Sequence, residues 1–182
     1  MSDTASTAKP LHNILSGEHV RGIIFGILMS ATMTYGMEVY NNAWQMGFAS
    51  LPGGFSNMTG EVFVRALHEF AFMCPIVFVI SSLWGNKLGG RLSERLVEPG
   101  RDTPFMCMLA RSGCTVLVMC PTMSLVASIL FNVVMAGISP WSLPAVWIGT
   151  VIKNFPMALL WNLFFAGPVT RGICGKLFSS AR

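Results

Sequence analysis

The chain has 182 residues, of which 53% are hydrophobic and only 11% are charged. A soluble domain carries about 25% charged residues, so this composition argues against a soluble globular protein and favours one dissolved in lipid. The formal net charge of +4 is small and the basic residues are spread along the chain. This pattern excludes a nucleic-acid-binding protein and leaves the lipid bilayer as the main partner.

Four apolar runs, each long enough to cross a bilayer, follow one another along the chain. The predicted membrane helices cover 20–44, 61–84, 106–135 and 145–170. We therefore expect an all-α, polytopic membrane protein made of a tail (1–19), a first helix pair (20–84), a connector (85–105), a second helix pair (106–170) and a second tail (171–182).

Lysine and arginine fall on one side of this arrangement. They occur in both tails, in the connector and at adjacent helix ends, whereas the loops 46–60 and 137–144 contain none. Basic residues mark the cytoplasmic side, so both termini and the connector are predicted to be cytoplasmic. Within the connector, Leu88, Leu92 and Val97 are spaced for a short amphipathic surface helix that ends at Pro99 and Gly100.

The two helix pairs resemble each other. At an offset of 90 residues the first helices of the two pairs share an arginine, a threonine, an asparagine and a glycine. These matches are Arg21 with Arg111, Thr32 with Thr122, Asn42 with Asn132 and Gly47 with Gly137; in the second helices Pro75 matches Pro156 and 90–92 matches 175–177. Two spans separate the copies, so both insert the same way round. This predicts a parallel tandem repeat folded as a four-helix bundle.

These repeated motifs resemble a bacterial membrane family known as domain of unknown function 2798, in two tandem copies over roughly 20–178. The resemblance implies a small, multi-pass protein of the bacterial inner membrane and no catalytic activity. The layout is also similar to the proteobacterial antimicrobial compound efflux family, which has two tandem helix pairs as well. That family places an acid soon after an arginine in its first helix, whereas here Glu38 comes well after Arg21.

Ionisable side chains inside the predicted spans form the sharpest candidate site. Counting about 1.5 Å per residue from the cytoplasmic ends places them at roughly 22–28 Å, in the outer third of the membrane. These residues are Glu38, Arg65, His68, Glu69 and Lys153. One interpretation is an outer vestibule with Glu38 or Glu69 as a proton or cation site. The other is a cap of salt bridges, including an i, i+4 pair of Arg65 with Glu69, that fixes helix register.

Three asparagines are candidate polar contacts. Asn42 and Asn132 precede Gly47 and Gly137 and suit helix termination. Asn162 lies near mid-depth, where a hydrogen bond to another helix or a contact with substrate is expected. Gly22 and Gly26, four residues apart, are spaced for close helix approach within the bundle or between protomers.

Sulfur-containing residues offer a weaker alternative. Met-Cys-Pro occurs twice, around Cys74 and Cys120, and Met29 and Met33 lie on one helix face. Thiolate and thioether ligands suit soft metals such as Cu(I), but methionine and cysteine are also ordinary packing residues in apolar helices.

No combination of nucleophile, base and acid typical of an enzyme occurs, and no cofactor is expected. We predict a small transporter or efflux-like protein with an outer polar vestibule, whose substrate the sequence does not name. A homodimer is attractive because four helices enclose little space. The alternatives are a non-transporting scaffold or accessory subunit and, less favoured, a soft-metal-binding protein.

Overall fold

The computed structural model describes residues 8–47, 53–98, 100–137 and 139–179. Parts of the predicted tails, part of the loop 46–60, and Pro99 lie outside these ranges. The described residues form helices and no strand. The α-helices are α1 (Ala8–Gly47), α2 (Glu61–Ile80), α3 (Asn86–Glu94), α4 (Pro104–Ala127), α5 (Leu143–Trp161) and α6 (Gly167–Ser179). Between them lie the 3-10 turns η1 (Gly54–Asn57) and η4 (Pro140–Ser142) and the π-helical segments η2 (Ser81–Gly85), η3 (Ser128–Met135) and η5 (Asn162–Ala166).

The π-helical segments join α2 to α3 and α5 to α6, and they extend α4. With α1, the described residues therefore form four continuous helical rods. The rods long and apolar enough to cross a membrane are His19–Gly47, Glu61–Glu94, Pro104–Met135 and Pro140–Phe178. This confirms the four helices expected from the sequence and an all-helical fold suited to a membrane. Which way each helix inserts stays a prediction.

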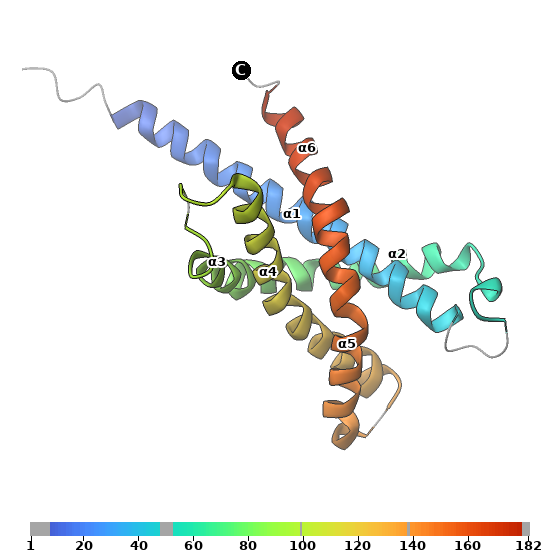
Figure 1. Cartoon of the computed structure of the whole chain (residues 1–182). Coiled ribbons are helices and arrows are strands. Elements are labelled where there is room, and N and C mark those ends of the chain that lie inside the picture. Colours follow the sequence, from blue (N-terminus) through green and yellow to red (C-terminus); the bar gives the residue numbers. More distant parts are fainter. Residues whose placement is uncertain (1–7, 48–52, 99, 138, 180–182) are drawn as a thin grey trace, which may run out of the picture.

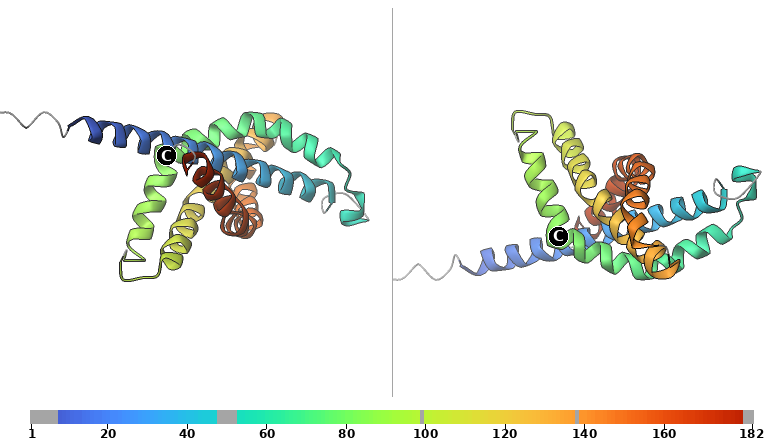
Figure 2. Two further views of the ribbon diagram at one scale, coloured as in Figure 1. Left: turned by 90° about the horizontal axis from the view of Figure 1, so that it is seen from above. Right: turned by 90° about the horizontal axis from the view of Figure 1, so that it is seen from below.

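The helices are longer than the apolar runs that predicted them. α1 begins at Ala8, well before residue 20, because a helix does not end where its apolar segment ends. The first ten residues expected in the connector, 85–94, continue α2 through η2 and α3 as one helical rod. Figure 2 shows this rod bending at the join, so that α3 leaves α2 in a new direction.

The two proline-containing second helices share one irregularity. η2 begins six residues after Pro75, and η5 begins six residues after Pro156; each segment is five residues long. Proline removes a backbone donor, and π-helical turns accommodate the disturbed ladder. The matching spacing agrees with the predicted repeat, which itself stays a prediction.

The rods form two antiparallel pairs that cross (Figures 1 and 2). α2 packs along α1, α4 packs along α5, and α3 packs against α4. The long rod of α5 and α6 crosses α1, whereas α2 makes no extensive contact with α4 or α5. The sequence predicted a four-helix bundle; in the structure the second helix of the first pair stays apart from the second pair, so the four helices pack in an open arrangement.

Small and polar residues occupy the interior, and large apolar residues lie outside. Every fourth residue from 154 to 174 on α5–η5–α6 is buried, and this row contains Asn, Ala, Thr and Cys. The α4–η3 row 116, 120, 124 and 128 is similar. In contrast, Phe72 on α2 is 60% exposed and Ile152 on α5 is 69% exposed. Small residues inside and large apolar residues outside are typical of helices packed in lipid, because burying large apolar groups there provides no driving force for helix association.

Three glycines allow close helix contact. A Cβ added at Gly36 would lie 2.3 Å from the Trp161 ring, and one at Gly89 would lie 2.8 Å from the Thr115 Cα. A Cβ at Gly85 would meet the Met119 side chain. The predicted pair behaves differently: Gly22 has open space around it and Gly26 has ordinary contact with Phe78.

Candidate functional site

Three ionisable residues lie at a similar depth on three helices. Glu38 comes nine residues before the end of its rod at Gly47, and Glu69 comes eight residues after the start of the next at Glu61. Lys153 comes thirteen residues after the start of the fourth rod at Pro140. At about 1.5 Å per residue, all three lie roughly 12–20 Å from one end of the molecule.

Glu38 and Glu69 form a carboxyl pair at the α1–α2 contact. Their carboxyl groups lie close enough to interact electrostatically. Asn42 Nδ2 donates to Glu69 Oε2 over 2.7 Å and to the Glu38 backbone oxygen over 3.0 Å. Glu38 and Asn42 are 6% and 3% exposed. Two carboxylates held close together repel each other, and binding of a proton or a cation relieves that repulsion.

Lys153 supplies the nearby positive charge. It interacts electrostatically with Glu38, although no direct ion pair joins it to either carboxyl group in the described structure. Its backbone oxygen accepts a 3.1 Å hydrogen bond from the Tyr40 hydroxyl, and its Nζ lies 6.0 Å from the centre of the Trp44 ring. Two aromatic residues of α1 therefore hold the lysine segment of α5 beside the pair.

Arg65 and His68 lie away from this cluster. Both are exposed, and Arg65 pairs with Glu61 over 2.9 Å instead of with Glu69. His68 Nδ1 lies 3.0 Å from the Val64 backbone oxygen. Depth along the helix was the basis of the predicted cluster, but Arg65 turns toward Glu61, one helical turn nearer the start of α2, and His68 faces away from Glu69 around the helix. In the described residues, the expected cap of salt bridges around Glu38 and Glu69 is not formed.

A row of polar side chains on α1 continues from the carboxyl pair toward the other end of the helix. Ser30, Thr34, Glu38 and Asn42 are all buried and are spaced by four residues, so they share one face. Thr34 Oγ1 has no hydrogen-bond partner within the structure described. We did not predict Ser30 and Thr34 as site residues, although their four-residue spacing from Glu38 is visible in the sequence.

Buried polar atoms on the facing helices belong to the same interior. Asn154 Oδ1, Asn162 Oδ1 and Ser128 Oγ are each enclosed and have no partner among the residues described. Such groups are costly in an apolar interior, and a few per domain mark functional or hydrated positions. Asn154, which follows Lys153 directly, was not predicted, although its place inside the apolar run 145–170 was a signal that could have found it.

The three asparagines that were predicted as polar contacts have different surroundings in the structure. Asn42 does not end α1, which continues to Gly47. Asn132 is half-buried within η3, and the chain turns at Gly137, whose φ of 66° is the left-handed conformation that favours glycine. Asn162 is buried as the first residue of η5, and its Oδ1 has no hydrogen-bond partner among the described residues.

The sulfur-containing candidates are distributed over different contacts. Cys120 packs in the core with Met33, and Met29 accepts a weak hydrogen bond from the Thr170 hydroxyl. Cys74 lies half-buried on α2, a helix without extensive contact with α4, which carries Cys120. Within the described residues, no three His, Cys, Asp or Glu side chains are grouped to hold a metal ion.

Comparison with known proteins gives a family likeness but no activity. The chain is 28% identical over 165 residues to "Uncharacterized protein YybC" of Bacillus subtilis (strain 168), an alignment that covers 85% of this chain and 89% of that protein. No solved structure matches the chain. Residues 18–97, which include most of α1 and all of α2 and α3, match the model of the family described as "Domain of unknown function (DUF2798)". A second copy in the other half of the chain stays a prediction.

Proposed function

We propose that this protein is a small transporter of the bacterial inner membrane, and that the Glu38–Glu69 pair is its proton- or cation-binding site. The observation that carries the proposal is the pair itself: two interacting carboxyl groups at the α1–α2 contact, with Asn42 bonded to both residues, inside rods apolar enough to span a membrane. Ionisable groups in that setting are costly and mark ion or proton pathways.

The surroundings support exchange of a proton at the pair. Lys153 stands close enough to interact with Glu38 and compete with a proton for the negative charge. Asn42 holds Glu69 by a direct hydrogen bond, which fixes the geometry of the pair. The buried hydroxyl groups of Thr34 and Ser30 lie about one and two helical turns from Glu38, respectively, on the same face, so they offer hydrogen-bonding positions along a path through the membrane.

Proton flux into reconstituted vesicles tests this function. Vesicles that contain the wild-type protein and an enclosed pH-sensitive dye are given a membrane potential that is negative inside. The initial rate at which the vesicle interior acidifies is then measured. We expect Glu38→Gln and Glu69→Gln each to reduce the rate to that of protein-free vesicles, since glutamine keeps the shape but cannot release a proton.

Glu61→Gln is the matched control. Glu61 lies on the same helix as Glu69, but it is exposed and paired with Arg65, so its substitution is expected to preserve the wild-type rate. If wild-type vesicles acidify no faster than protein-free vesicles, proton passage is refuted and the scaffold or accessory role becomes the better interpretation. If all three variants behave alike, the site is not the carboxyl pair.

A further inference from the structure

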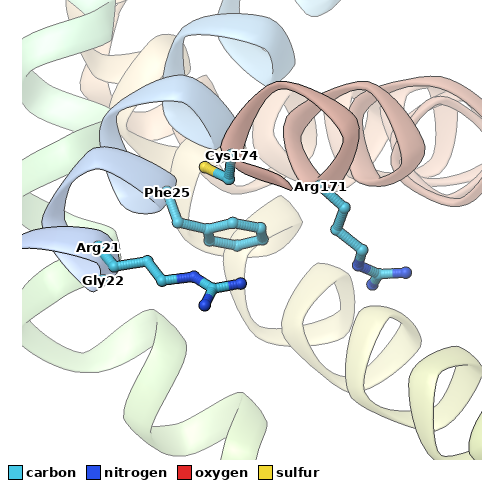
Figure 3. A pocket seen from close by; sticks show the side chains of 5 residues that line it. All are labelled: Arg21, Gly22, Phe25, Arg171 and Cys174. Atoms are coloured by element: carbon cyan, nitrogen blue, oxygen red, sulfur yellow. The ribbon is translucent and has the colours of Figure 1, made fainter. Parts of the chain in front are cut away.

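A pocket of about 420 Å³ lies at the opposite end of the molecule from the carboxyl pair, and it is lined by residues of α1 and α6. Arg21 is two residues past the start of the first rod, and Arg171 is seven residues before the end of the fourth. The first rod begins at the end where the fourth one finishes, so both arginines lie near the same membrane boundary. Figure 3 shows Phe25 between the helix that carries Arg21 and the helix that carries Arg171 and Cys174.

Neither arginine has an acidic partner among the side chains described. The Arg21 Cζ lies 5.7 Å from the centre of the Phe178 ring, a cation–π contact, and Arg171 Nη1 contacts the Met108 sulfur. Both arginines are exposed, so their donors are available to a ligand. Two guanidinium groups with unused donors provide a site for the oxygen atoms of a phosphate group.

We infer that this pocket binds the phosphate headgroup of an anionic phospholipid. The lining combines the two cations with Phe25 and the buried Cys174, so one side suits a phosphodiester and the other suits the glycerol and upper acyl chain. Its place near the ends of two apolar rods is where lipid headgroups lie, and basic pockets between membrane helices bind such headgroups. A soluble phosphate would use the arginines but not the apolar side.

The test uses purified full-length protein in a non-ionic detergent, titrated with fluorescent phosphatidylglycerol. We expect saturable binding that either Arg21→Gln or Arg171→Gln weakens about tenfold, the loss that corresponds to one charge-assisted contact. Arg111→Gln is the matched control: Arg111 is the predicted repeat counterpart of Arg21 but does not line the pocket. The affinity of Arg111→Gln for phosphatidylglycerol is expected to equal that of wild type.

Two competitors separate the sources of phosphate. Unlabelled phosphatidylglycerol should displace the probe from wild type, whereas inorganic phosphate at equal concentration should not. Equal displacement by inorganic phosphate would overturn the lipid assignment in favour of a soluble-phosphate site. Equal affinity of wild type, Arg21→Gln and Arg171→Gln would overturn the pocket altogether. If a glutamine variant fails to fold, Arg21→Met and Arg171→Met serve instead: they keep an unbranched side chain but lose the charge and the donors, and unchanged binding in both refutes the site.

Discussion

Gly36→Ala is expected to destabilise the crossing of α1 and α5. The added methyl group would lie 2.3 Å from the Trp161 indole, so the ring has to move. That ring also donates a 3.0 Å hydrogen bond from Nε1 to the Thr32 backbone oxygen and stacks on Phe165 with centroids 4.3 Å apart. Overpacking costs about 1–3 kcal/mol, and the loss of the hydrogen bond adds about 1 kcal/mol.

Gly22→Ala is the control for this prediction, because it makes the same change on the same helix where a Cβ meets nothing within 4 Å. Any gain in helix propensity is common to both variants, so it cancels in their comparison. We expect the free energy of unfolding of Gly36→Ala to be about 2–4 kcal/mol lower than that of Gly22→Ala. Titration of detergent-solubilised protein with dodecyl sulfate, followed by circular dichroism, measures the difference. Equal unfolding midpoints would refute the packing of α1 against Trp161.

Two further substitutions test contacts at the ends of the core. Trp147→Phe removes the 2.8 Å hydrogen bond from its indole nitrogen to the Pro121 backbone oxygen and should lower the free energy of unfolding by about 1 kcal/mol in the same titration. An unchanged free energy of unfolding would contradict this contact between α4 and α5. Asn42→Leu removes the donor to Glu69, and we expect a loss of about 1–2 kcal/mol, with Asn132→Leu costing less because Asn132 is only half-buried. Equal losses in the two variants would show that the bond to Glu69 has no special role.

The sequence was sufficient for the number and class of helices because a bilayer sets a minimum apolar length. It was less informative about where helices end. The connector was predicted as a surface segment on its charges, yet the residues up to Glu94 continue the second rod, since lysine and arginine are good helix formers in water as well. The open crossing of the two pairs could not be predicted either, because it depends on which small residues meet, as at Gly36 and Gly89.

The sequence predicted how far along their helices the candidate residues lie, but not which way their side chains face. Counting residues from the helix ends placed Glu38, Glu69 and Lys153 at one level, and the structure brings these three close together. The same counting included the exposed residues Arg65 and His68, because axial rise carries no information about rotation around the helix, which turns His68 away, or about the choice of ion-pair partner, which is Glu61 for Arg65. The four-residue spacing of the buried row on α1 contained that missing information for one helix, but no pattern in the sequence relates the rotation of one helix to that of the next.

The most direct measurement is the infrared spectrum of the purified protein at neutral pH, in the region where protonated carboxyl groups absorb. The proposed site shares a proton between Glu38 and Glu69, so wild type should show a protonated carboxyl band that shifts in heavy water. The band should disappear in Glu38→Gln and in Glu69→Gln and persist in Glu61→Gln. A wild-type spectrum without this band, or a band that survives both substitutions, would contradict a shared proton at this pair and the transport site built on it.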